Sequence, residues 1–121
     1  MKGLINILGQ HYYYSTINEL IKQDSLKEVS AIIIEELYLE EFLLKGKKIL
    51  QKDVDQIIII SENVDTAISN IEAIGILLIS AESFENALKI ASLSSDSCKE
   101  IICIVKEDEN KISEILNTIG A

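Results

Sequence analysis

The sequence predicts an α/β fold, a three-layer α/β/α sandwich around a five-stranded, mostly parallel β-sheet. Apolar runs of strand length recur along the 121 residues, and amphipathic segments lie between them. Hydrophobic residues make up 48% of the chain but aromatic residues only 5%, so the core must be built from aliphatic side chains. Unbroken β-branched runs indicate strands buried on both faces, and right-handed crossovers then place helices over both faces of the sheet.

Five runs are predicted as strands, and a helix is predicted after each. The strands are residues 4–8, 30–34, 56–60, 74–79 and 100–105, and the helices are residues 15–27, 39–52, 64–73, 84–93 and 108–119. Ser61 is the expected cap of the third helix, and either Ser80 or Ser83 caps the fourth. The β-α unit is thus repeated five times, which is typical of a flavodoxin/CheY-like fold.

The chain is expected to form a single domain over residues 1–121, because this length fits one hydrophobic core and not two. A shift of about 44 positions aligns Ile32 with Ile76 and Ile57 with Ile101, which suggests an internal β-α-β-α repeat in residues 30–73 and 74–119. Evenly spaced, Ile-rich strands also match one another through composition alone, and this simpler explanation is favoured.

Charge restricts the classes of partner. The formal net charge is -9, and the one basic cluster, Lys45, Lys47 and Lys48, is most simply a solvated helical face. Nucleic acid and anionic membrane surfaces are therefore not expected partners. The N-terminus lacks a signal sequence and no apolar run approaches about 18 residues, so we expect a cytoplasmic protein without membrane insertion.

Residue types give no complete catalytic or cofactor site. His11 is the one histidine, which leaves no metal-binding set to complete, and the glycine-rich phosphate-binding motifs and the G-x-S-x-G motif are absent. Cys103, in an apolar run, is expected in the core, and Cys98 in a loop. No metal and no cofactor are predicted. Whether the chain is an enzyme stays open, with a non-enzymatic function favoured.

The candidate site lies where the parallel strands end, because ligands bind outside the carboxyl ends of such strands. The residues expected there are Gly9, Gln10 and His11; Glu35 and Glu36; Ser61, Glu62 and Asn63; Ser80 and Glu82; and Lys106, Glu107 and Asp108. His11, Glu35 and Ser61 are the candidates for a ligand or phosphoryl site. The imidazole of His11 can accept a phosphoryl group or act as a general base, but a surface or capping role is the simpler explanation.

An acidic stretch follows the second predicted strand. Glu35, Glu36, Glu40 and Glu41 fall within seven residues of sequence, "EELYLEE". Clustered carboxylates can hold Mg²⁺. A solvated loop and helix N-terminus, where negative charge suits the helix macrodipole, is the favoured explanation.

Residues 28–92, "EVSAIII…ALKIAS", resemble the second half of a response-regulator receiver domain. Glu35 falls at the position of the phosphoacceptor Asp, Ser61 at that of a Ser or Thr, and Ser80 or Ala81 at that of a Lys. The acidic pair of the first strand is missing, one β-α unit is missing as well, and Glu cannot form the usual aspartyl phosphate. The chain therefore resembles an atypical receiver, of the kind found N-terminal to ParA/MinD-type ATPases. That resemblance implies a bacterial regulatory domain without a phosphorylation site.

A second resemblance links "AIGILLIS" and "EIICIVKEDENKISEILNTIG" to bacterial microcompartment shell domains, and it implies self-assembly. Those domains contain a central hairpin, and the second strand of that hairpin is missing from this sequence.

The leading hypothesis is a non-enzymatic regulatory or assembly domain that acts through protein-protein interaction or self-association, with a surface in residues 64–93. An apolar edge strand that needs covering favours an oligomer. One alternative is a His-dependent phosphocarrier that combines His11 with Glu35 or Ser61. Another is a small-ligand or nucleotide-binding domain that uses the same crevice.

Overall fold

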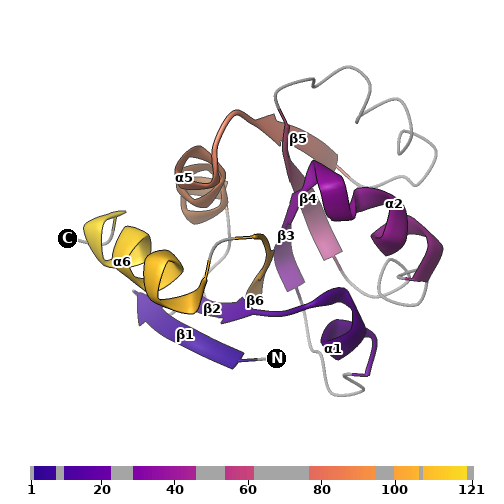
Figure 1. The fold of residues 1–121 in the computed structure, drawn as a ribbon. Helices are drawn as coiled ribbons and strands as arrows, with labels where there is room; N and C mark the ends of the chain where they lie inside the picture. Colours follow the sequence, from indigo (N-terminus) through magenta and orange to yellow (C-terminus); the bar gives the residue numbers. More distant parts are fainter. Residues whose placement is uncertain are drawn as a thin grey trace.

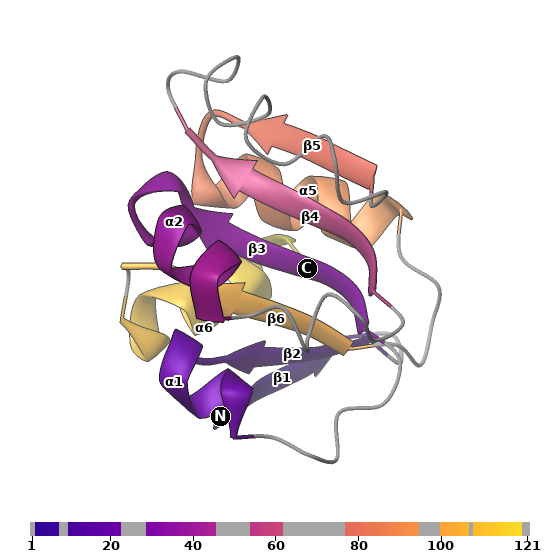
Figure 2. The ribbon, with the colours of Figure 1, turned by 90° about the vertical axis from the view of Figure 1, so that its right-hand side faces the viewer.

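All six strands of the described chain belong to one sheet. The computed structural model describes residues 2–7, 10–22, 29–45, 54–61, 77–94, 100–106 and 108–119. In these ranges the strand order is β1-β2-β6-β3-β4-β5, which can be followed across the sheet in Figure 2. The strands are β1 (Lys2–Ile7), β2 (Gln10–Tyr14), β3 (Val29–Glu35), β4 (Val54–Ile60), β5 (Leu77–Ala81) and β6 (Glu100–Ile104). Only β1 runs antiparallel to its neighbour, so the predicted α/β fold with a mostly parallel sheet is confirmed.

Strand β2 is the element that the apolar pattern does not predict. It contains His11 and three tyrosines in place of an aliphatic run. Its partners explain why it forms: His11 pairs with Asn6 of antiparallel β1 and with Glu100 of parallel β6. The first predicted strand is therefore an edge strand that is followed by another strand, and the expectation that a helix follows it directly is wrong.

The parallel strands lie in the order β2-β6-β3-β4-β5. The chain moves outward from β3 to β4 to β5, and β6 then returns to lie between β2 and β3. Flavodoxin and CheY share this architecture but order their parallel strands 2-1-3-4-5. The likeness is therefore one of layers and strand direction, and the strand order differs.

Helices cover both faces of the sheet. They are α1 (Ile17–Ile21), α2 (Glu36–Lys45), α5 (Phe84–Ser94) and α6 (Glu109–Ile119). Figures 1 and 2 show α1 and α2 on one face and α5 and α6 on the other. Two hydrophobic clusters correspond to these two sides: Leu20 and Phe42 pack with Ile32 and Ile57, whereas Leu88 packs with strand residues of the other face.

The central strand β3 shows why the sheet is parallel and covered. All seven of its residues are buried, without the alternation of a strand that faces water on one side. In the described chain, no helix has the length and apolarity that crossing a membrane requires. The predicted helix at residues 64–73 and Cys98 lie outside the described residues, as do parts of both halves of the suggested repeat.

Side-chain caps start helices α1 and α6. The backbone N–H of Glu19 donates to Thr16 Oγ1 (3.2 Å), so Thr16 is the N-cap of α1, and the Thr16 hydroxyl donates in turn to the Glu19 carboxylate (3.2 Å). At α6, the N–H of Lys111 donates to Asp108 Oδ1 (2.8 Å). Asp108, expected among the residues of the candidate site, thus has a local role in starting α6.

Tyr12 joins β2 to α5. Its side chain is 2% exposed, and its hydroxyl lies 2.6 Å from Ser92 Oγ. We expect Tyr12→Phe to lower the free energy of unfolding by about 1 kcal/mol, the usual worth of one such hydrogen bond, as measured by urea denaturation. Tyr13→Phe, at the neighbouring and less buried tyrosine, is the matched control and should be close to neutral. Equal losses for the two variants would contradict a specific role for the Tyr12 bond.

Candidate functional site

A cleft of about 390 Å³ lies at the carboxyl edge of the parallel sheet. It is formed by residues that end or follow β3, β4, β5 and β6. These residues are Glu35, Glu36, Leu37, Ile60, Ser61, Glu82, Ser83, Phe84 and Lys106. The cleft is therefore at the sheet edge where the sequence predicts a site.

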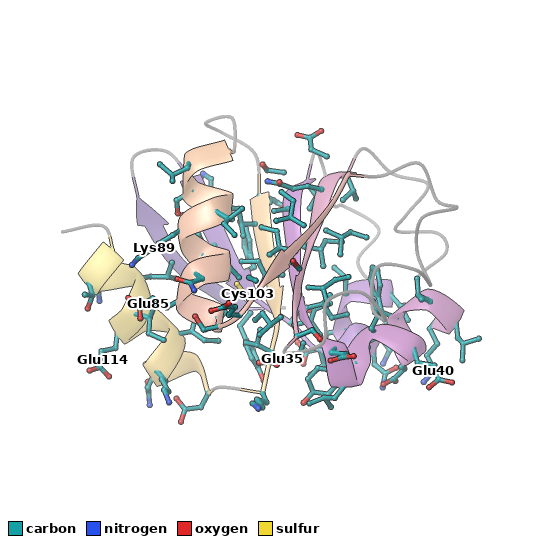
Figure 3. The ribbon with its side chains drawn as sticks, turned by 90° about the horizontal axis from the view of Figure 1, so that it is seen from above. Glu35, Glu40, Glu85, Lys89, Cys103 and Glu114 are labelled. Carbon is teal, nitrogen blue, oxygen red and sulfur yellow. The ribbon has the colours of Figure 1, made fainter. Side chains whose placement is uncertain are left out.

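The directions of the helices explain why a cleft opens here. Neighbouring strands β3 and β6 are followed by α2 and α6, which pack on opposite faces of the sheet. The segment after β3 leads to one face of the sheet and the segment after β6 leads to the other, so neither fills the space between the two strand ends. Parallel sheets bind ligands at this position. Figure 3 shows Glu35 between the two layers of helices.

Glu35 and Glu36 bring two consecutive carboxylates into the cleft. Glu35 ends β3 and is 7% exposed, and Glu36 starts α2. The hydroxyl of Ser61, the residue after β4, donates a hydrogen bond to the Glu36 carboxylate. The backbone N–H of Ser61 also donates to the carbonyl of Ala81 (3.1 Å), which fixes the end of β4 against the end of β5. The first turn of α2 is thus tied to the adjacent strand end.

The other side of the cleft comes from the ends of β5 and β6. Glu82 and Lys106 are exposed there. Ser83 caps α5, because its Oγ accepts from the N–H of Asn86 (3.2 Å) and its carbonyl accepts from the N–H of Ala87 (3.0 Å). Of the two predicted caps of this helix, Ser83 is therefore the one used. Among the described residues, three carboxylates, one ammonium group and two serine hydroxyls line the cleft.

His11 lies at the opposite end of the sheet. His11 pairs with Glu100 of β6 in the strand register, and Glu100 pairs in turn with Val29 at the start of β3. Glu35 is six residues further along β3, a distance of about 20 Å at the rise of a strand. The structure thus brings Glu35 and Ser61 to one cleft and leaves His11 outside it. A phosphoryl site that combines His11 with Glu35 or Ser61 is not formed.

Lys106 belongs to the cleft, although it was not among the three candidate residues. The signal that could have singled it out is its place directly after the strand that ends "IICIV". The strand order, which brings β6 beside β3, is needed to see that it lies across the cleft from β4 and β5. Other residues expected at this edge, Gly9, Glu62, Asn63 and Glu107, lie outside the described residues, and Gln10 is part of β2.

The acidic stretch of the sequence does not act as one site. Glu35 and Glu36 line the cleft, Glu40 is exposed on α2, and Glu41 forms an ion pair with Lys45 (3.0 Å). Among the described residues, no three His, Cys, Asp or Glu side chains are grouped as a metal ion would require.

Cys103 is buried in the core, as expected. Its side chain is 0% exposed in β6, and burial raises the pKa of its thiol to about 12. A thiol in this state is neither a nucleophile nor a metal ligand at neutral pH.

No protein-family model matches the chain, and a search of curated proteins found no relative. The function is therefore argued from the geometry of the cleft.

Proposed function

We propose that this chain is a non-enzymatic regulatory domain whose carboxyl-edge cleft binds a small molecule with a protonated amine. The observation that supports it most is the excess of carboxylates, Glu35, Glu36 and Glu82, over the ammonium of Lys106 among the described residues of the cleft. A partly desolvated carboxylate is stabilised by each further charge-assisted hydrogen bond, and a ligand ammonium group can donate one in addition to the contacts within the protein.

The remaining cleft residues set the shape of the ligand. Leu37, Ile60 and Phe84 provide apolar surface for a short hydrocarbon stem. Lys106, at the end of β6, repels a second cationic centre on that side and attracts a carboxylate or hydroxyl of the ligand. An amine carried on a short aliphatic chain, with a hydrogen-bond acceptor at the far end, matches this arrangement.

Binding is favoured over catalysis by the residues that line the cleft. The described lining residues include neither an imidazole nor a thiol, and the hydroxyl of Ser61 donates to the Glu36 carboxylate. The receiver resemblance agrees with a regulatory role, since Glu35 places a carboxylate that cannot be phosphorylated in the usual way at the end of a central strand. A domain of this kind acts by passing its ligand state to a protein partner.

Thermal unfolding with a panel of small molecules tests the proposal. 4-Aminobutyrate, 5-aminovalerate and ethanolamine are the amines; succinate, citrate and phosphate are the anions; AMP and ADP represent the nucleotide alternative. A ligand at about 100 times its Kd stabilises by about 2.7 kcal/mol, and in a domain of this size this raises the Tm by several degrees. We expect at least one amine to do so and the anions to have no effect.

Glu35→Gln separates binding in the cleft from general attraction to an acidic protein. This variant should lose most of the stabilisation by the amine. Glu114→Gln, which removes an exposed carboxylate on α6 and lies on a different part of the surface (Figure 3), should keep it. No response to any amine, or equal responses in the two variants, would contradict the proposal. Stabilisation by ADP alone would favour the nucleotide alternative.

A further inference from the structure

Helix α2 exposes two leucines on the side that faces away from the sheet. Leu37 is 63% exposed and Leu44 is 71% exposed, whereas Leu39 and Phe42 of the same helix are 5% and 0% exposed. A single exposed leucine is ordinary on a protein surface. Two on one short helix, with buried residues on the other side, form an exposed apolar stripe among the residues that the structure describes.

The spacing places both leucines on one line along the helix. They are seven residues apart, which is two turns and about 10.5 Å at the rise of an α-helix. Glu40 lies between them in sequence and is exposed, and Figure 3 shows it on α2 on the outer side of the molecule. We call Leu37, Glu40 and Leu44 the α2 face.

We propose that the α2 face docks an amphipathic helix of a protein partner, with apolar residues at i and i+7 and Lys or Arg residues between them. Apolar anchors at this spacing are the usual way in which one helix engages another surface. The charge of the partner follows from complementarity: on α2, Glu36 and Glu40 carry negative charge, Glu41 is paired with Lys45, and the chain carries a net charge of -9.

A second copy of the chain fits this face less well. An antiparallel pair of α2 helices would place Leu37 against Leu44, but it would also bring Glu40 of one copy beside Glu41 of the other, where the ion pair of Glu41 with Lys45 competes with any contact between the copies. Two chains of charge -9 repel each other in addition. A basic partner removes both penalties.

The α2 face adjoins the cleft. Leu37 belongs to both, because it lines the cleft as well as the exposed stripe, and Glu36 before it is tied to Ser61. A ligand that binds Glu35 or Glu36 therefore changes the contacts of the first turn of α2, the helix that carries the α2 face. The inference takes its regulatory meaning from the proposed function, although docking itself needs no ligand.

Fluorescence anisotropy with a labelled synthetic peptide tests the docking. The peptide is helical, with leucines at i and i+7 and lysines around them, and it is titrated with the protein in the absence of any amine ligand. We expect saturable binding that Leu44→Ser weakens about tenfold. Leu37→Ser is the second variant and should weaken it as well. Leu93→Ser is the matched control, because Leu93 is 90% exposed on α5, on the other face of the sheet.

Charge is tested with the same assay. A peptide with glutamates in place of the lysines should not bind, and Glu40→Gln should weaken binding and reduce its dependence on salt. Equal affinity of Leu44→Ser, Leu93→Ser and the unaltered protein would overturn the inference, since binding would then be non-specific attraction to an acidic chain. A dimer seen by light scattering without peptide, and lost in Leu44→Ser, would overturn it too, because a second copy would occupy the face.

The two proposals fail separately. Amine-induced stabilisation that persists while the peptide does not bind would overturn only the docking inference. Peptide binding that depends on Leu44, with no response to any amine, would support the docking inference and contradict the cleft ligand.

Discussion

Phe42→Ala is expected to lower the free energy of unfolding by about 3–5 kcal/mol, the cost of a cavity left by a fully buried aromatic ring. Phe42 is 0% exposed and is one of the largest side chains in the cluster that joins α2 to the sheet. Since small domains are stable by only about 5–15 kcal/mol, this loss is a large share of the total. Urea denaturation followed by circular dichroism measures it.

Leu44→Ala on the same helix is the matched control for Phe42→Ala. Leu44 is 71% exposed, so its truncation should change stability by no more than about 0.5 kcal/mol. A similar loss for the two variants would mean that α2 does not pack on the sheet through the side that contains Phe42. The cleft would then lose its explanation, because the position of Glu36 depends on that packing.

The second large effect is expected in the rate at which thiol reagents label Cys103. Its pKa of about 12, against 9.0 for an unburied thiol, makes its thiolate about a thousandfold scarcer at pH 8, and burial blocks access as well. In a Cys98→Ser background, we expect labelling by a thiol reagent to be at least a thousandfold slower in the native protein than in urea. Fast labelling of the native protein would contradict the buried position of β6.

The same residue predicts how stability depends on alkaline pH. The folded pKa of Cys103 is above its unfolded value, so the folded state holds its proton more tightly, and this stability is present below pH 9 and lost as pH rises from about 9 toward 12. Burial raises the pKa of Tyr12 as well, and it acts in the same direction. Cys103→Ala should therefore show a shallower fall of unfolding free energy over this range than the unaltered protein. Equal slopes would contradict it.

The sequence predicts the α/β class because the physics of buried parallel strands is local. Runs such as the one around Ile33 or Ile58 are apolar on both sides, and this pattern cannot be satisfied by a half-exposed strand. This pattern does not predict strand β2. Its Tyr12 is buried, but the strand forms because β1 and β6 offer hydrogen-bonding edges on either side, which the local sequence does not reveal.

The candidate site is predicted in part for the same reason. Glu35 and Ser61 directly follow apolar runs of adjacent parallel strands, so their meeting in one cleft follows from the general rule for strand ends. The apolar pattern predicts His11 at that edge because it does not reveal β2. Lys106 joins the cleft only through the return of β6 to the middle of the sheet, a non-local feature that spacing along the chain does not determine.

Backbone NMR during a titration with 4-aminobutyrate tests the central claim, a specific amine site at the carboxyl edge of the sheet, most directly. We expect the amide signals of Glu35, Ser61, Ser83 and Lys106 to shift along one saturable curve, and that of His11 to stay in place. The Glu35→Gln variant should show no such curve. Unsaturable shifts spread over the acidic surface, or shifts gathered around His11, would contradict the claim.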